Sequence, residues 1–507
     1  MRNLSKSKII AYRQCPKRLW LEIHKPELRD DSASQAVFAI GNQVGDMAQE
    51  VYNTDGSGVL IDINEIGWPE AFARSGKLLS EGKSIIFEAA MKANGALALA
   101  DVMIPVQDDS ADQGLSWEMI EVKSAASVKD YYRDDIAVQS YIATACGVPL
   151  SSVSLAHIDT SFVYQGDGDY SGLFHRADLT EEAMSRHDEV EQWLSGAHEI
   201  ADRDEEPDIC TGSHCSSPFN CSFIAHCQSQ EPQPAFPISC LPRFSKANKE
   251  LLAADGITEL KDVPKSMLNS TQAMVQKNTL AGTTYFDADG AAAELSRETV
   301  DGAPHYFLDF ETSNSAIPIL KGTRPFQQVP FQFSMHTLHP DGTLEQETFL
   351  DLSGDDPRRG FAEALVKACG DTGPVFVYHA SFEKTVIRKE AIAFPDLADE
   401  LSAIVERVVD LLPIARDYYY NPSQNGSWSI KYVLPAICPD LHYSDLEGVQ
   451  DGQMAISAYQ EAIKPDTTPE RKAEIHSQLD KYCALDTLAM VRLWEFFSGK
   501  VGASPAP

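Results

Sequence analysis

The segment HYFLDFETS, residues 305–313, places two acids inside an apolar strand, and this pattern strongly restricts the possible folds. Side chains on a strand alternate between the two faces of a sheet, so Asp309 and Glu311 share one face. Burying such carboxylates costs several kcal/mol unless they are paired or bound to a metal ion. The segment therefore predicts a buried sheet strand with an acidic site on one side.

The segments that follow supply partners for this strand. The runs VPFQFSMHTL and LEQETFLDL alternate apolar and polar residues and are separated by Pro340-Asp341-Gly342, which predicts a hairpin. Near the C-terminus, LDKYCALDTLAMVRLWEFF predicts an amphipathic helix. Tyr482 and Asp486 are four residues apart on that helix and therefore share a face.

A second group of charged residues lies in the N-terminal part of the chain. GALALAD predicts a strand that ends at Asp101, and LSWEMIEVKSA predicts another strand, on which Glu121 and Lys123 share a face. One acid from each of two strands, with a lysine beside them, suits phosphodiester hydrolysis assisted by Mg²⁺ or Mn²⁺. The alternative is a surface E-x-K pattern that arises by chance.

Four cysteines, Cys210, Cys215, Cys221 and Cys227, lie within 18 residues, and Cys15 lies far upstream. Ten cysteines in 507 residues are too few for a disulfide scaffold, so clustered thiols favour metal binding in a reducing compartment. Four thiolates can hold an iron–sulfur cluster or a zinc ion, and the neighbouring His214 and His226 keep zinc open.

Composition limits the classes of protein to consider. Hydrophobic residues make up 43% of the chain, enough for sizeable cores, and every apolar run is too short for a membrane helix. We therefore expect a cytoplasmic protein without a membrane partner. The net charge of −33 argues against a generally basic nucleic-acid-binding surface. Residues 1–25 nevertheless hold seven Lys or Arg against one acid, and they could form a local phosphate-binding face.

The motifs of the N-terminal part, around Asp101, Glu121 and Lys123, resemble the PD-(D/E)XK nucleases of the RecB-like type. This resemblance rests on the D…ExK pattern, the preceding FEA at residues 87–89 and the helix DDIAVQSYIATACG. The His usual near the first helix is absent from GNQVGDMAQEV, and Tyr141 follows its glutamine by two residues instead of four. The resemblance implies a restriction-endonuclease-like fold and site roles for Asp101, Glu121, Lys123, Glu88 and Gln139.

The cysteine spacing resembles the iron–sulfur-bearing subset of these nucleases, which includes the CRISPR-associated adaptation nucleases. In that subset one N-terminal and three C-terminal cysteines hold a [4Fe–4S] cluster. The resemblance implies the ligands Cys15, Cys215, Cys221 and Cys227, and it leaves Cys210 spare.

The C-terminal motifs resemble the DEDD exonucleases of the RNase H-like fold, DEDDy subtype. That resemblance implies two divalent metal ions, with Asp309, Glu311 and Asp486 among the ligands and Tyr482 positioning the attacking water. VYHASFEKTVI puts Glu383 where the family has an aspartate, and Asp410 is the rival for this role.

Nearly the whole chain looks like a bacterial family of uncharacterised proteins that fuse these two halves. We expect a multidomain α/β protein with a PD-(D/E)XK domain (1–230), a Pro-rich linker and helical region (231–303), an RNase H-like domain (304–498) and a disordered tail (499–507). The helical stretch KELLAADGITELKDVP is similar to a helix–hairpin–helix, and core packing explains it equally well.

The expected function is a metal-dependent nuclease, an exonuclease that acts on DNA ends or single strands, with DNA ahead of RNA as the partner. Two alternatives stay open. One is a nucleic-acid-binding or recruitment protein in which one or both sites are inactive. The other is a redox or sensory iron–sulfur protein.

Overall fold

The computed structural model describes residues 2–31, 35–109 and 114–500, and it is a mixed α/β protein with two compact units. Unit 1 comprises Met1–Gln233 with Ser315–Phe326, and unit 2 comprises Pro234–Asn314 with Gln327–Pro507. Residues 501–507 of the expected tail lie outside the described residues. Among the described helices, none combines the length and the apolar character that crossing a bilayer requires.

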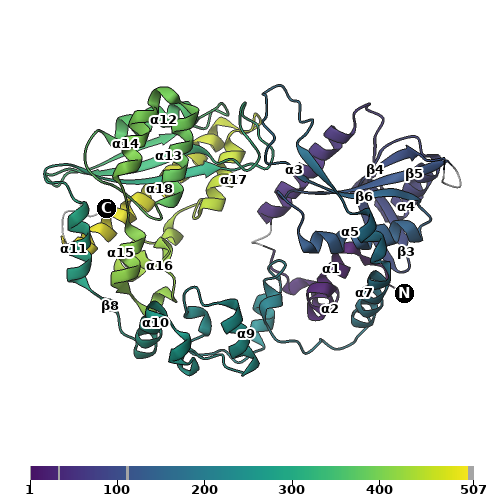
Figure 1. Cartoon of the computed structure of the whole chain (residues 1–507), viewed down its shortest axis with the longest axis horizontal. Coiled ribbons are helices and arrows are strands. Elements are labelled where there is room, and N and C mark those ends of the chain that lie inside the picture. The colour runs from purple at the N-terminus through teal and green to yellow at the C-terminus, as the bar shows by residue number, and fades with distance from the viewer. Residues whose placement is uncertain (1, 32–34, 110–113, 501–507) are drawn as a thin grey trace. The chain divides into compact units, whose positions relative to one another are not determined.

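Unit 1 is built around one mixed sheet with helices on both sides (Figure 1). Its strands are β1 (Leu4–Ser5), β2 (Val59–Leu60), β3 (Ile86–Ala93), β4 (Ala96–Gln107), β5 (Leu115–Lys123), β6 (Leu150–Ile158) and β7 (Phe174–Asp178). Its helices are α1 (Lys6–Gln14), α2 (Pro16–His24), α3 (Gln35–Tyr52), α4 (Ile63–Glu81), α5 (Asp130–Ala145), α6 (Thr180–Ser185), α7 (His187–Ala201) and α8 (Ile224–Ser229).

The order of strands in this sheet is β2-β3-β4-β5-β6-β7, and β1 pairs with β4. β3, β4 and β5 form an antiparallel meander, and α5 then connects β5 to β6, which is parallel to it. Two parallel strands need such a crossover, because the chain must return to the starting end of the sheet before the second strand begins. The side chains of Met119 and Leu155 pack with α1, α2, α5 and α7, so Glu121 and Lys123, in phase with Met119, face the same helices.

Unit 2 contains the second large sheet. Its strands are β8 (Tyr285–Phe286), β9 (His305–Ser313), β10 (Val329–Leu338), β11 (Leu344–Leu350), β12 (Val375–Val377), β13 (Val408–Asp410) and β14 (Tyr419–Tyr420). Its helices are α9 (Lys246–Ala254), α10 (Ser270–Ala281), α11 (Ala288–Glu298), α12 (Arg358–Cys369), α13 (Ser381–Ala393), α14 (Ala398–Arg407), α15 (Leu411–Tyr418), α16 (Ile430–Ile437), α17 (Gly452–Ala462) and α18 (Pro469–Ser498).

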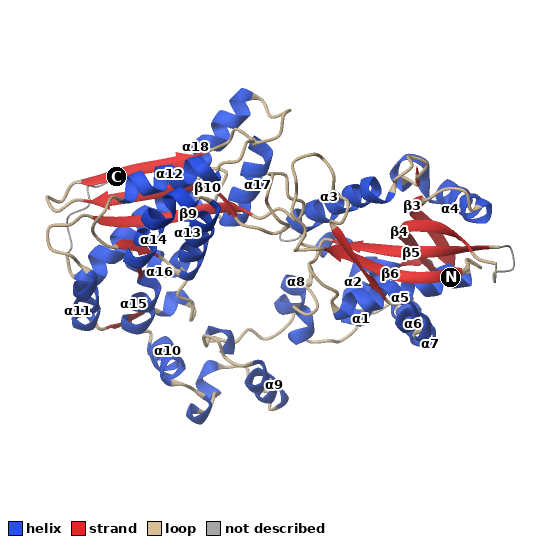
Figure 2. Ribbon diagram, turned by 45° about the horizontal axis from the view of Figure 1, so that its top comes forward, coloured by secondary structure: helices blue, strands red, loops and turns tan. Residues whose placement is uncertain are grey.

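The order of strands in this sheet is β11-β10-β9-β12-β13, with the first three antiparallel and the last two parallel to β9 (Figure 2). Both faces are covered. Phe307 and Phe376 pack with α11, α15 and α18, whereas Leu308 and Phe333 pack with α12, α13 and α14. This two-sided burial explains why β9 reads as an almost continuous apolar run.

The connection between β9 and β10 leaves unit 2 and packs on unit 1. We call its residues Ser315–Phe326 the strap. The strap pairs with the loop at Tyr164 through Tyr164 N–H to Thr323 O (3.0 Å) and Gly322 N–H to Tyr164 O (2.7 Å). Its Ala316 packs with Val44 and with other buried apolar residues of unit 1. The chain therefore passes three times between the two units.

The strands and helices expected for the candidate sites are confirmed. β4, β5, β9, β10 and β11 are strands, and α5 and α18 are helices, at the predicted places. The similarity of KELLAADGITELKDVP to a helix–hairpin–helix predicts a second helix after Gly256, but the structure has only a single 3₁₀ turn there, Leu260–Asp262. Val263 and Pro264 stop it, because the residue before a proline disfavours helical geometry.

Candidate active sites and the cysteine cavity

Three carboxylates of unit 2 meet in one cluster, with Asp309 and Glu311 on β9 and Asp486 on α18. Their ligand oxygens all lie within 4.8 Å of one another. Glu311 and Asp486 are 8% and 7% exposed, and Asp309 is partly buried. Sequence analysis singled out all three, and the fold brings them together.

The phase of β9 explains the meeting. Phe307, two residues before Asp309, packs against Trp494 of α18, so the acids of β9 face that helix. Asp486 lies eight residues before Trp494, about two helical turns, and thus on the same side of α18. Hydrogen bonds fix the helix on the sheet, among them Gln332 Nε2 to Leu479 O at 3.0 Å.

Burial and mutual repulsion change the acidity of these groups. Desolvation raises the pKa of Asp309 well above its usual range, and the charges of Asp486 and Glu311 add to this rise. Desolvation likewise raises the pKa of Glu311 well above its usual range. The pKa of Asp486 is raised to about 6 by burial, and the neighbouring Tyr443 and Lys431 limit the rise. A divalent cation would relieve this repulsion, and carboxylates are the ligands that Mg²⁺ prefers.

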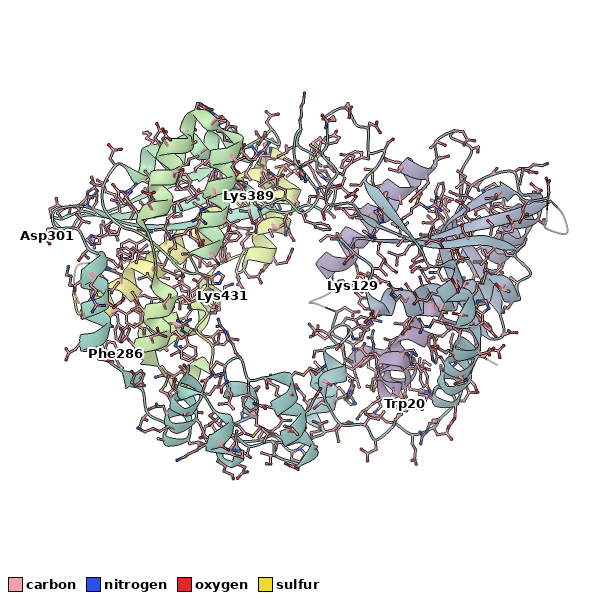
Figure 3. The ribbon with its side chains drawn as sticks, viewed as in Figure 1. Trp20, Lys129, Phe286, Asp301, Lys389 and Lys431 are labelled. Carbon is pink, nitrogen blue, oxygen red and sulfur yellow. The ribbon has the colours of Figure 1, made fainter. Side chains whose placement is uncertain are left out.

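Two tyrosines and a lysine border the acid cluster. Tyr443 Oη donates to Asp486 Oδ1 at 2.5 Å. Lys431 on α16 (labelled in Figure 3) has its Nζ 5.2 Å from the ring centroid of Tyr443 and 5.7 Å from that of Tyr482. Burial, followed by the Asp486 charge, raises the pKa of both tyrosines. Tyr443 could not be predicted from the sequence, because the irregular segment around it has no periodic pattern.

The structure assigns different surroundings to Glu383 and Asp410. Glu383 on α13 is 3% exposed, and its Oε2 has no hydrogen-bond partner among the described residues. Burial raises the pKa of Glu383 to about 8, and its charge contributes to the raised pKa of Asp309. Asp410 instead accepts backbone N–H bonds from His379, Ala380 and Leu412 at 2.9, 3.0 and 2.9 Å. Asp410 is thus a cap, and Glu383 is the unpaired carboxylate.

In unit 1, the predicted acids and lysine also lie together. Asp101 Oδ2 accepts a hydrogen bond from Val122 N–H at 2.7 Å, which holds Asp101 beside Glu121. Lys123 Nζ donates to Glu121 Oε1, and Gln139 Nε2 donates to Glu121 Oε2. Glu88 lies opposite Asp101 in the β3–β4 ladder, because Phe87 pairs with Val102 and Ala89 pairs with Ala100. Its φ of +56° is unusual for a glutamate.

Two further residues complete this site and were not identified from the sequence. Lys6, at the start of α1, donates to Glu121 Oε1 at 2.7 Å, and it lies 3.3 Å from Asp135 on α5. Lys123 also bonds Asp135 Oδ2, at 2.6 Å. Asp135 lies on the same face of α5 as Gln139, four residues away, so the helix pattern could have suggested it. Lys6 offers no such signal because it is remote in sequence.

The charges of this site divide its acids into two kinds. Burial opposes ionisation of Glu121, but Lys123 and Lys6 outweigh it and hold its pKa below the usual range. Burial, with the adjacent Glu121 charge, raises the pKa of Asp101 well above its usual range. Burial and Glu121 also raise the pKa of Glu88. One carboxylate is thus kept charged beside others that resist ionisation.

A cavity in unit 1 is lined by the thiols predicted to bind a cluster. Its lining includes the four predicted cysteines and the spare Cys210, with His214 beside them. Cys15 lies between α1 and α2, whereas the others come from the stretch before and within α8. Burial raises the pKa of Cys227 to about 11, and the neighbouring thiols add to that rise.

The basic N-terminal stretch does not form the open phosphate-binding face that its composition suggested. Five of its cations lie within 4 Å of carboxylates in the fold. They are Lys6, Arg13, Lys17, Arg18 and Lys25, paired with Glu121, Asp134, Glu206, Glu22 and Glu206 respectively. The excess acids of this chain neutralise most of the local positive charge.

Two comparisons with known proteins overlap this chain. A family described as a domain of unknown function, DUF2779, matches residues 306–429, from β9 to the residue before α16. This region includes the two acids of β9 and Glu383, and it ends before Asp486. A protein of Mycoplasma pneumoniae named "Uncharacterized protein MG366 homolog" is 26% identical over 208 residues, which cover 37% of this chain and 31% of that protein. The match thus spans about a third of the relative's length.

Proposed function

We propose that this chain is a divalent-metal-dependent nuclease that hydrolyses phosphodiester bonds at two sites, with DNA ends or single strands as the substrate. The observation that carries the proposal is the cluster of Asp309, Glu311 and Asp486, whose ligand oxygens lie within 4.8 Å of one another. Burying several acids together lowers the free energy of unfolding, and such clusters are typical of functional sites.

The order of elements supports the finer assignment of each unit. In unit 2 an acid-bearing first strand, two antiparallel partners and a closing helix with Tyr482 and Asp486 match the RNase H-like, DEDDy resemblance. In unit 1 an antiparallel meander with Asp101 and Glu121, followed by the crossover helix α5, matches the PD-(D/E)XK resemblance.

In unit 2, Asp309, Glu311 and Asp486 would hold the cation, with Glu383 as the fourth carboxylate. A bound Mg²⁺ or Mn²⁺ would acidify the attacking water and offset the phosphate charge. Tyr482 borders the acids where a hydroxyl can orient that water. The Tyr443 hydrogen bond fixes one oxygen of Asp486.

In unit 1, Asp101 and Glu121 would hold the cation, and Glu88 and Gln139 border them. Lys123 and Lys6 keep Glu121 ionised, as a metal ligand must be. The same two ammonium groups lie where they can offset negative charge on a phosphodiester oxygen as the bond breaks. Sequence alone suggested one lysine for this role, and the fold adds the second.

We further propose that Cys15, Cys215, Cys221 and Cys227 hold a [4Fe–4S] cluster, with zinc as the alternative. Tetrahedral zinc with Zn–S bonds of about 2.3 Å needs sulfur atoms about 3.8 Å apart. The four thiols line one cavity in unit 1, which supports a shared metal group of either kind.

A cleavage assay with two single variants tests the nuclease proposal. Oligonucleotides labelled at either end, as single-stranded DNA, duplex DNA and RNA, are incubated with Mg²⁺ or Mn²⁺. We expect Asp309→Asn to lower cleavage at the unit 2 site, and Asp101→Asn to lower cleavage at the unit 1 site, by at least about 100-fold each. Both variants should keep the fold. Cleavage unaffected by either change would contradict the proposal. Nucleic-acid binding without any cleavage would favour the recruitment alternative.

A further inference from the structure

Three aromatic side chains form a row in unit 1, between the Lys123 site and the cysteine-rich segment. We call Tyr132, Tyr131 and Phe219 the aromatic row. The ring centroids of Tyr131 and Tyr132 are 4.4 Å apart, and those of Tyr131 and Phe219 are 5.7 Å apart. The row begins directly at the candidate site, because Lys123 Nζ lies 5.5 Å from the Tyr132 ring.

Cations lie along the same row. Lys129 Nζ, at the N-terminal end of α5 (labelled in Figure 3), lies 5.9 Å from the Tyr131 ring and 5.8 Å from the Tyr132 ring. The guanidinium carbon of Arg18 lies 4.7 Å from the Phe219 ring, but Arg18 is already paired with Glu22 at 3.0 Å. Lys129 is exposed, and its ammonium group has no hydrogen bond or ion pair within the described part of the chain. In a chain with a net charge of −33, where acids pair with most nearby cations, such a lysine is available to an external anion.

The row is not explained by core packing alone. Tyr132 and Phe219 pack at the edge of the main hydrophobic core of unit 1, but Tyr131 is not part of that core. All three rings are partly exposed. Gln14 holds the Phe219 end in place, because its Nε2 donates to Phe219 O at 2.7 Å and to His214 O at 2.8 Å. The rings therefore stand on a fixed support and remain partly exposed.

We propose that the aromatic row with Lys129 is a binding track for a single strand of DNA that leads to the Lys123 site. This inference rests on the proposed nuclease function and adds the strandedness of its substrate. Unpaired bases stack on aromatic rings, while cations beside the rings neutralise the backbone phosphates. A duplex hides its base faces, so the row selects single strands.

Fluorescence anisotropy with a labelled 12-nucleotide oligo(dT), without added Mg²⁺ or Mn²⁺, tests the track on the full chain. Tyr131→Ala should weaken binding about 5- to 100-fold. Tyr131→Phe keeps the ring and should bind like wild type, and a thermal melt checks that both variants are folded. Trp68→Ala is a matched control, because Trp68 stacks with Phe72 in the same unit, also near a lysine, and should leave binding unchanged.

Lys129→Gln tests the electrostatic part separately. If Lys129 neutralises one phosphate, the slope of log affinity against log salt concentration should fall by about 0.7. A slope equal to that of wild type would show that Lys129 does not contact the strand and would overturn its place in the track.

Three outcomes separate this inference from the nuclease proposal. Cleavage that depends on Asp101, together with wild-type binding by Tyr131→Ala, would overturn the track and leave the nuclease standing. Ring-dependent binding without any cleavage would support the track and contradict the nuclease. Equal binding of a duplex of the same length, or tighter binding of oligo(U), would overturn the assignment to single-stranded DNA.

Discussion

At the scale of single residues, the buried acids of unit 2 make its metal-free stability depend on pH. The pKa of Asp486 is raised by burial to about 6 from 3.8, so the folded state holds this proton more tightly than the unfolded state. The resulting stability is present at low pH and is lost as pH rises through about 6. Glu383, with a pKa raised to about 8, extends the loss upward. Together these two shifts imply that unit 2 loses roughly 5 kcal/mol between pH 5 and 8.

Urea unfolding of metal-free protein, followed by fluorescence at several pH values, measures this loss. Asp486→Asn should flatten the dependence, because an amide does not titrate in this range, and Mg²⁺ should restore stability at high pH by mass action. A pH dependence identical in Asp486→Asn and wild type would contradict the interpretation.

Tyr482 provides the second residue-scale prediction. If its hydroxyl orients the attacking water, Tyr482→Phe should slow cleavage at the unit 2 site about 10- to 1000-fold without changing substrate binding. Single-turnover kinetics in an Asp101→Asn background isolate this site. Tyr419→Phe is the matched control, since it removes a buried hydroxyl that donates to Ala436 O. An equal loss in both variants would point to general destabilisation.

At the scale of elements, Asp410 and Glu383 can be told apart by the positions they occupy. Asp410 lies at the end of β13, whereas Glu383 lies on α13. Asp410 at the end of β13 caps α15 and also ties down the turn between β12 and α13. Asp410→Ala should therefore destabilise unit 2 by about 1–3 kcal/mol. Its effect on cleavage, measured well below the unfolding temperature, should be small.

Glu383→Gln should have the opposite signature. Removing a buried, unpaired carboxyl should leave unit 2 equally or more stable, while cleavage falls by about 100-fold or more because the fourth carboxylate is lost. Denaturant unfolding and cleavage of the same preparations make the comparison. If Asp410→Ala abolishes cleavage in a folded protein and Glu383→Gln does not, the assignment must be reversed.

At the scale of the whole molecule, the cysteine cavity joins the two ends of unit 1. Cys15 belongs to the N-terminal helices, and the remaining thiols lie about 200 residues later, so the proposed metal group would close a long loop. If these thiols hold the proposed [4Fe–4S] cluster, Cys15→Ser should remove iron and the broad absorption near 400 nm, and it should lower the unfolding temperature of unit 1 only. Cys146→Ser, at an exposed thiol of the same unit, is the control. Bound zinc without iron would favour the alternative metal.

The strap gives a second prediction at this scale. Phe326 lies in sequence between two strands of unit 2, yet it packs on the sheet of unit 1. Phe326→Ala should therefore speed hydrogen exchange in β6 and β7 of unit 1, at a cost of about 1–3 kcal/mol. Phe349→Ala on β11 is the matched change and should affect unit 2 instead. Faster exchange confined to β9 and β10 in Phe326→Ala would contradict this account.

Much of the local structure could be predicted because it depends on neighbours in sequence. Alternation identified β9 and the phase of Asp309 and Glu311, and helical spacing placed Tyr482 beside Asp486. The prediction of a second helix after Gly256 is wrong, because Val263-Pro264 stops the helix after the single 3₁₀ turn Leu260–Asp262 despite a favourable composition.

The sequence by itself determined which strands and helices form and which of their faces carry acids, because both follow from periods of 2 and 3.6 residues. Only the tertiary structure decided which distant groups meet. It placed Lys6 on Glu121, committed Asp410 to backbone amides, left Glu383 unpaired and packed the strap on unit 1. These outcomes depend on packing and on competition for hydrogen-bond partners between residues up to hundreds of positions apart, which no local pattern records.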